Sequence, residues 1–188
     1  MISLASTAMF AYDPLTGREI WKVRHGGHTS SVSPVFGGGL ILATTGYRTV
    51  EMLAIRPDGL GDVTDTHVVW RVESKDVPTT PSPVVVDDLV IMISNRGTVT
   101  CMEIETGKTV WRKRLGGNHL ASPICDGERI YFFSVNGKTS VIRGGRGFEE
   151  LAENQLESGF MASPAAGGRA LFLRTKTHLY RIEESVTH

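Results

Sequence analysis

The chain has 188 residues, of which 40% are hydrophobic and 21% charged, a composition typical of globular proteins rather than disordered or fibrous ones. Basic and acidic residues number 20 each, so the formal net charge is zero, which argues against a general binder of nucleic acid or of acidic membranes. No stretch approaches the ~20 apolar residues of a membrane span, and the N-terminus lacks the basic and apolar regions of a signal peptide.

Two independent sequence markers reveal an internal repeat. A Ser-Pro pair recurs with spacings of 49, 40 and 41 residues, and tryptophan recurs with spacings of 49 and 41. One further repeat length of 40 beyond the last tryptophan reaches Leu151, an apolar substitute. A period near 40 residues indicates repeated structural units. The markers are Ser33, Ser82, Ser122 and Ser163 for the first, and Trp21, Trp70 and Trp111 for the second.

The predicted units follow one another along the chain as sets of short strands. Residues 7–23 supply only an outer strand pair, and 30–73 supply a full unit with an insertion at 57–62 between its third and fourth strands. Full units follow at 80–114 and 119–152, and 160–183 supplies three strands. In the clearest unit, Val- and Ile-rich runs at 82–86, 89–94, 98–104 and 108–113 are separated by turn residues.

This pattern predicts an all-β fold. Antiparallel four-stranded units of about 40 residues are the sequence signature of β-propeller blades. We therefore expect a partial β-propeller of about four four-stranded antiparallel blades, forming a single segment over residues 1–188.

The turn motifs resemble those of a known family. Residues 11–17, followed by Trp21, resemble the repeat motif of quinoprotein (PQQ) dehydrogenases and of their non-enzymatic relatives, and residues 103–107, followed by Trp111, form a second copy. Residues 61–71 resemble planctomycete-type non-enzymatic members. In these motifs Gly17 and Gly107 make the turn into the outer strand, so that the tryptophan can dock flat between neighbouring blades. We predict this structural role for Trp21, Trp70 and Trp111.

The resemblance implies an eight-bladed ring, of which this chain would be about half, similar to the C-terminal half of a longer propeller. Either the chain is part of a longer protein, or two half-rings associate, with the N-terminal hairpin of one completing the open blade of the other. Exposed strand edges and apolar blade faces favour association. We accordingly expect a homodimer or a larger assembly.

The resemblance also bears on function, and three alternatives stay open. The first is a non-catalytic binding or scaffolding module of the bacterial envelope or periplasm, with protein or anionic partners and no cofactor. The second is a domain of a quinone-dependent alcohol or sugar dehydrogenase, which would bring PQQ and calcium, although no set of residues here matches that site. The third is a carbohydrate-binding propeller. For the first we expect no catalytic residue, no metal, no nucleic-acid partner and no membrane span.

A binding surface follows from the alternation of turns between the two faces of the disc. Turns after second strands and after outer strands share one face, which collects basic residues, whereas the opposite face collects carboxylates such as Asp13, Asp58 and Asp88. The basic face predicts a site for an anionic ligand. Its candidate residues are Arg48, Arg96, Arg114, His119, Lys138 and Lys176.

Two other clusters are weaker candidates. His25 and His28 could share a metal, but the glycines between them make the segment flexible and no third ligand lies nearby in sequence. Asp58, Asp62 and Asp65 in the insertion could bind calcium, yet their spacing is not that of an EF-hand. A solvated turn and an acidic surface loop are the simpler interpretations.

Overall fold

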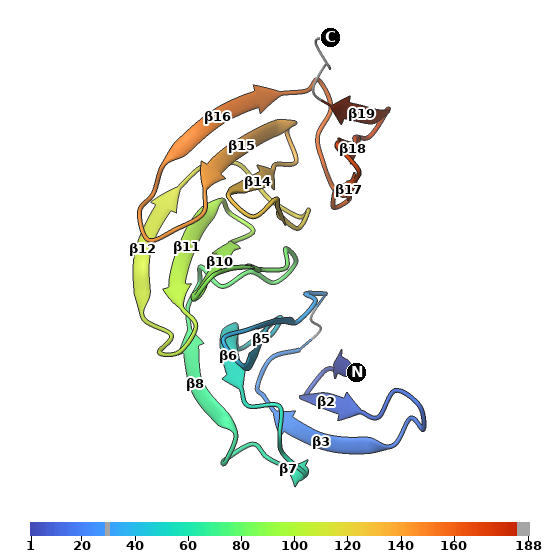
Figure 1. Cartoon of the computed structure of the whole chain (residues 1–188), viewed down its shortest axis with the longest axis vertical. Coiled ribbons are helices and arrows are strands. Elements are labelled where there is room, and N and C mark those ends of the chain that lie inside the picture. The colour runs from blue at the N-terminus through green and yellow to red at the C-terminus, as the bar shows by residue number, and fades with distance from the viewer. Residues whose placement is uncertain (29–30, 184–188) are drawn as a thin grey trace.

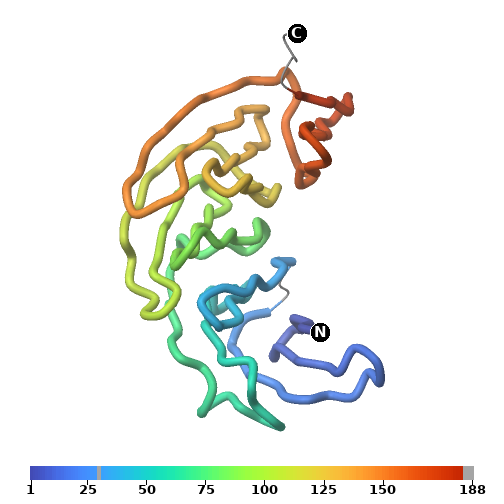
Figure 2. The backbone as a smooth tube through the Cα atoms, viewed as in Figure 1, coloured from blue at the N-terminus to red at the C-terminus, as the bar shows by residue number. Residues whose placement is uncertain are grey.

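The computed structural model describes residues 1–28 and 31–183, which form strands, turns and loops with no helix. Residue 30, the predicted start of the second unit, lies outside the described residues. The strands form five sheets that succeed one another along an arc (Figure 1), and their pairing is antiparallel except for one short strand added to the first sheet. Figure 2 shows that the chain travels once along this arc, so that units consecutive in sequence are neighbours in space. The fold is therefore all-β and built from repeated sheets, as the sequence predicts.

Three sheets have the four antiparallel strands expected of a complete blade, and within each of them the strands are paired in chain order. Their outermost strands β8, β12 and β16 lie on the convex rim of the arc, and β5, β10 and β14 lie nearer its concave side (Figure 1). Blade 2 consists of β4 (Val35–Gly37), β5 (Leu40–Thr44), β6 (Glu51–Ile55) and β8 (Val68–Glu73). Blade 3 consists of β9 (Val84–Val86), β10 (Leu89–Ile93), β11 (Thr98–Glu103) and β12 (Thr109–Arg114). Blade 4 consists of β13 (Ile124–Cys125), β14 (Arg129–Phe133), β15 (Lys138–Arg143) and β16 (Glu150–Gln155).

The sheets at the two ends of the arc differ from these. Blade 1 consists of β1 (Ile2–Leu4), β2 (Ala8–Tyr12) and β3 (Glu19–Arg24), with β7 (Gly61–Asp62) of the insertion added in parallel to β3. The sequence predicts only two strands here, and β1 is an addition, because three residues are too few to show an alternating pattern. Blade 5 consists of β17 (Ala165–Gly167), β18 (Ala170–Arg174) and β19 (Leu179–Glu183).

The hydrophobic core lies between blades rather than within one. Met9 and Trp21 of blade 1 pack with Leu53 of blade 2, and Met52 of blade 2 packs with Met92 of blade 3. The central strands β5, β6 and β10 are buried along their whole length because a blade covers each of their faces. Apolar burial between adjacent sheets therefore holds the arc together.

A second set of contacts repeats from blade to blade at the Ser-Pro positions. The backbone N–H of Ser33 donates to Ser82 Oγ, that of Ser82 to Ser122 Oγ, and that of Ser122 to Ser163 Oγ, each at 2.9 Å. Ser82 and Ser122 thus each accept a hydrogen bond through Oγ from the preceding Ser-Pro position and donate one through the backbone N–H to the following Ser-Pro position. This explains why the Ser-Pro pair recurs with the blade period.

Candidate functional site

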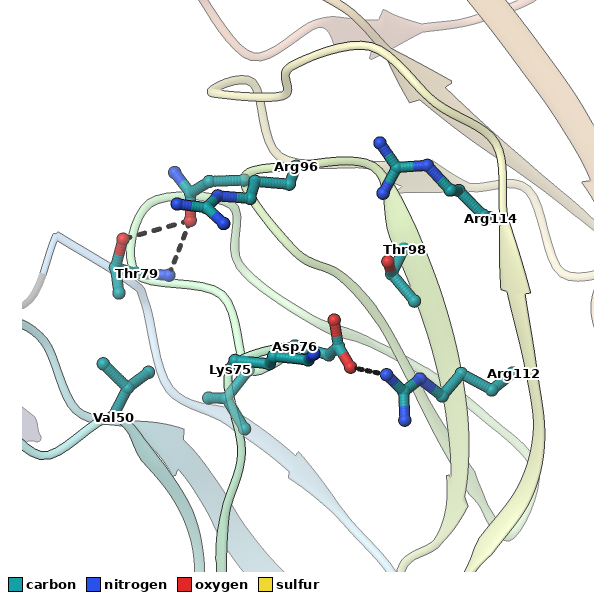
Figure 3. A pocket seen from close by; sticks show the side chains of 10 residues that line it. Val50, Lys75, Asp76, Thr79, Arg96, Thr98, Arg112 and Arg114 are labelled. Atoms are coloured by element: carbon teal, nitrogen blue, oxygen red, sulfur yellow. Dashed lines mark hydrogen bonds and ion pairs between the residues drawn. The ribbon is translucent and has the colours of Figure 1, made fainter.

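A cavity of about 470 Å³ opens between blades 2 and 3. It is formed by the connection from β8 to β9, by the turn between β10 and β11, and by the outer strand β12. The sequence predicts that such turns and connections share one face, and here they converge on one pocket (Figure 3). Its lining residues are Val50, Lys75, Asp76, Val77, Thr79, Asn95, Arg96, Thr98, Arg112 and Arg114.

The pocket has an excess of positive charge, with four cationic side chains and one carboxylate. Asp76, whose side chain is only 12% exposed, pairs with Arg112. Figure 3 shows this pair on one side of Thr98, with Arg96 and Arg114 on the other. Within residues 1–28 and 31–183, neither Arg96, Arg114 nor Lys75 forms an ion pair. Three exposed cations are therefore left to interact with a ligand.

The turn that carries Arg96 is held by a small hydrogen-bond network. The backbone N–H and the hydroxyl of Thr79 donate to Asn95 Oδ1 at 2.9 and 3.0 Å, and Asn95 Nδ2 donates to Thr80 Oγ1 at 3.0 Å. The N–H of His119 donates to the Asn95 carbonyl. Hydrogen bonds thus hold both the side chain and the backbone carbonyl of Asn95. Because Asn95 directly precedes Arg96, the position of Arg96 at the pocket rim is well defined.

The structure brings two of the six predicted basic residues together in this pocket, Arg96 and Arg114. Arg48, at φ +84°, is exposed in the connection between β5 and β6 of blade 2 but is not among the pocket-lining residues, and Lys176 is exposed in blade 5 between β18 and β19. Lys138 is engaged in an ion pair with Glu153 at 2.5 Å. The basic face is thus not a continuous ring of available cations but concentrates at the junction of blades 2 and 3.

His119 is a correction to the predicted surface. Its side chain is buried, and both ring nitrogens lie within 3.1 Å of carbonyl oxygens, those of Phe133 and Gly116. Burial lowers the pKa of His119 below the ordinary histidine value, although both carbonyls oppose that effect. The ring therefore stabilises the loop between blades 3 and 4 and does not present a surface charge.

Asp76 and Arg112 were not among the residues predicted from the sequence to form this site. Arg112 had a usable signal, because residues two apart on a strand point to the same side, so Arg112 and Arg114 belong to one face of β12. Asp76 had none, because its partner lies 36 residues away in the next blade.

The tryptophans each contact the following blade. The indole Nε1–H groups of Trp21, Trp70 and Trp111 donate at 2.9 Å to the carbonyls of Pro57, Ile104 and Gly145 respectively. A Cβ atom at Gly107 would lie 2.7 Å from the Trp70 ring, so this indole rests on the glycine turn of the next blade. Gly17 has the same left-handed φ of about +70°, but a Cβ there would meet no described atom within 4 Å.

Neither weaker metal candidate gains support from the geometry. In the part of the chain that the structure describes, no group of three or more His, Cys, Asp or Glu side chains lies close enough together to hold a metal ion. Asp62 instead accepts hydrogen bonds from the Thr64 hydroxyl at 2.6 Å and from Arg24 at 2.9 Å. Burial lowers the pKa of His25. The same described residues include no helix long and apolar enough to cross a membrane.

Comparison with solved structures identifies the architecture. BamB from Moraxella catarrhalis superposes with a TM-score of 0.74 at 18% identity, over 97% of this chain and 57% of that one. The computationally designed Ika4 protein superposes with a TM-score of 0.66 at 12% identity, over 90% of this chain and all of that one. The fold is a partial β-propeller.

Sequence comparisons indicate the same group of proteins. Residues 60–147 match the family described as outer membrane protein assembly factor BamB. The BamB proteins of Salmonella typhimurium and Escherichia coli K12 are each 29% identical over 89 residues, or 47% of this chain, and that of Marinobacter adhaerens is 26% identical over 80 residues. The aligned stretch spans about a fifth of the length of these relatives, 20 to 22%. The similarity supports a repeat of the quinoprotein-like, BamB-like type.

Proposed function

We propose that this chain is a non-catalytic binding module that docks an acidic segment of a protein partner in the pocket between blades 2 and 3. The observation that carries the proposal is the set of three exposed cations, Lys75, Arg96 and Arg114, around a cavity whose single carboxylate is already paired with Arg112. A carboxylate-bearing segment would neutralise this excess charge, and arginine offers it bidentate hydrogen bonds.

The comparisons support a scaffold role in the cell envelope. The matched relatives are named as outer membrane protein assembly factors, a role that consists of acting on other proteins. A rigid stack of sheets with connecting loops on its faces suits such a role, because the scaffold positions loop residues at little entropic cost. We accordingly propose a periplasmic or envelope location for the protein that contains this chain.

The test is the binding of a fluorescently labelled hexaglutamate peptide, followed by anisotropy. We expect the double variant R96E/R114E to bind about 10-fold more weakly or worse, since reversing two exposed charges removes at least two ion pairs of up to ~1 kcal/mol each. Added salt should weaken the wild-type binding, as it screens exposed charges.

The matched control is K108E/K113E, which changes the net charge by the same amount. Both lysines are exposed in the β11–β12 hairpin and lie outside the pocket lining. This control should bind as the wild type does, apart from a small general charge effect. Equal losses in both double variants would show that the peptide senses only net charge, and the proposed pocket would then be wrong.

A further inference from the structure

The loop that joins β5 to β6 in blade 2 is longer than the corresponding loops of blades 3 and 4. A backbone hydrogen bond closes it from Thr45 N–H to the Glu51 carbonyl, whereas the same kind of bond closes the loop of blade 3 from Ser94 to Thr98. The loop of blade 2 is therefore two residues longer, and that of blade 4 has the same length as that of blade 3. Blade 2 presents additional surface at this point.

Within this loop, Arg48 occupies a position that favours glycine. Counted from the residue that opens the loop, Arg48 corresponds to Gly97 in blade 3 and to Gly137 in blade 4. All three have a left-handed φ, of +84°, +80° and +90° respectively. This conformation is strained for arginine but not for glycine, which has no Cβ to crowd the backbone. The Arg48 side chain is exposed and forms no hydrogen bond or ion pair with a described residue, so no contact within the chain offsets the strain.

Hydrogen bonds nevertheless hold the loop in one conformation. The Thr45 hydroxyl donates to the Thr49 carbonyl at 2.6 Å, and the His28 N–H donates to the Tyr47 carbonyl at 2.7 Å. The side chain of Tyr47 is 75% exposed on this fixed backbone. A loop that is already ordered loses little entropy when it binds a partner.

The loop leads directly to the pocket between blades 2 and 3. Its residue Val50 lines the pocket, and Figure 3 shows Val50 at the end opposite to Arg114. Arg48 is two residues before Val50, so their backbones are at most about 7 Å apart. The exposed Arg48 therefore adds positive charge at the blade 2 end of the pocket, next to that of Lys75 and Arg96.

We propose that Tyr47 and Arg48 form a second contact for the partner segment that docks in the pocket, and that this segment carries an apolar side chain and a further carboxylate beyond its acidic residues. The inference rests on the proposed function of the pocket and adds the kind of sequence that is bound. Arg48 pairs with the further carboxylate, and the Tyr47 ring packs against the apolar side chain. Tyrosine and arginine are the residue types that often dominate binding at protein interfaces. The strain at Arg48 is retained because the partner requires its side chain.

Two labelled peptides of equal charge test the contact with Tyr47. In one, six glutamates are flanked on each side, going outward, by two serines, a leucine and a glutamate; in the other, serines replace both leucines. The two serines span about 7 Å, the distance from the pocket to the loop. We expect the leucine peptide to bind about 5-fold more tightly in anisotropy, because its apolar side chain leaves water on the tyrosine ring. Equal binding of the two peptides would contradict the proposal.

Substitution of Tyr47 assigns this difference to the loop. Y47A should abolish the preference for the leucine peptide. The control L60A removes another exposed apolar side chain, which lies in the insertion and outside the pocket lining, and should retain the preference. A preference that survives in Y47A would place the leucine elsewhere on the surface, and the proposed contact would be wrong.

Glycine at position 48 separates the strain of Arg48 from its contact with the partner. R48G should raise the urea midpoint because glycine relieves the left-handed strain, and should weaken binding of the leucine peptide about 5-fold because one exposed ion pair is lost. The control K176G removes the same charge at an exposed lysine in the corresponding turn of blade 5, and should bind the peptide as the wild type does. A lower midpoint for R48G would show that Arg48 stabilises its own fold. Equal binding by R48G and K176G would show that Arg48 makes no contact, and either result would overturn the proposal.

The outcome for the loop can be distinguished from the outcome for the pocket. If R96E/R114E loses hexaglutamate binding while the leucine and serine peptides bind wild type equally, the pocket stands and the loop contact is wrong. If R96E/R114E binds hexaglutamate as the wild type does, the pocket is wrong and the loop contact with it.

Discussion

At the scale of single residues, the repeated tryptophans connect neighbouring blades in two ways. Each indole contributes buried apolar area and one hydrogen bond to a carbonyl of the following blade. Gly107 adds a third element, because its missing side chain leaves room for the Trp70 ring. The glycine of the turn is therefore required for packing as well as for its positive φ.

Alanine substitutions at Gly17 and Gly107 separate these two requirements. Both residues have φ near +70°, so each substitution should cost about 1–2 kcal/mol of unfolding free energy from backbone strain. Only G107A also forces its Cβ against the Trp70 ring, which should add about 1–3 kcal/mol as overpacking. Urea unfolding of both variants measures the difference.

Equal losses of stability in G17A and G107A would contradict this prediction. They would mean that the Trp70 ring moves aside at little cost and that the indole does not hold the blade junction tightly.

Sequence identifies such residues by their spacing but not by their environment. The period of 41 from Trp111 reaches Ala152, and Ala152 in fact occupies the tryptophan position, since it pairs with Val141 as Trp111 pairs with Cys101. The expected substitute Leu151 is wrong by one residue. His119 was misjudged for a related reason, because its position in a loop between blades predicts exposure whereas the fold buries it.

At the scale of elements, the insertion within blade 2 serves blade 1. Its strand β7 pairs with β3, the Val63 N–H donates to the Lys22 carbonyl, and Pro57 accepts the hydrogen bond from Trp21. Asp62 bonds to Arg24 and to the Thr64 hydroxyl. The insertion thus covers the outer edge of blade 1, a surface that would otherwise be open to unwanted strand pairing.

We predict that D62N lowers the free energy of unfolding at pH 7. Hydrogen bonds from Thr64 and then Arg24 lower the pKa of Asp62 from its usual 3.8 to about 2. A lowered pKa in the folded state means that the carboxylate stabilises the protein above pH 3.8, and that this contribution disappears as the pH falls through about 2. The difference between wild type and D62N should therefore vanish over that range in urea titrations.

Asp65 provides the control from the same loop. It is exposed and forms no hydrogen bond or ion pair with a described residue, so D65N should leave stability unchanged at both ends of the pH range. A pH-independent effect of D62N would show that the loop packs through its shape and not through the charge of Asp62.

Regular elements were predictable where the pattern is long, and less so at the ends of units. The strands of blade 3 were expected within two residues of their observed bounds because turn residues separate them clearly. The predicted unit 119–152 ends within the outer strand of blade 4, which runs from Glu150 to Gln155, since the polar sequence of this strand lacks the Val and Ile that mark the other strands. Tertiary pairing with β15 determines its position.

At the scale of the whole molecule, the two ends of the arc expose blade faces of the kind that elsewhere are buried. Met9 and Ala11 of β2 pack against blade 2, so Phe10 and Tyr12 lie on the opposite face, where their rings stack at 5.9 Å. In blade 5, Leu173 packs toward blade 4 and Phe172 lies on the other side, 36% exposed. Both faces are apolar at their centres.

The pairing of strands in blade 1 argues against association of two copies of the chain by exchange of the N-terminal hairpin. A hairpin over 7–23 that completes the open blade of a partner would have to be free of its own sheet, but β2 and β3 already lie between β1 and β7. We therefore expect association through the faces of blades 1 and 5 rather than by exchange of that hairpin, and such contacts between copies are driven by apolar burial.

The expected result is a homodimer or larger assembly whose mass in light scattering increases with protein concentration. I20K in blade 1, combined with F172K in blade 5, should weaken this association about 10-fold or more, since two buried charges replace apolar contacts. Ile20 and Phe172 are each 36% exposed, whereas Leu60 is 82% exposed in the insertion, so L60K is a control for adding charge elsewhere. Because apolar contacts are not screened, association should persist in salt that abolishes hexaglutamate binding. A monomer at every concentration would contradict association through the faces of blades 1 and 5.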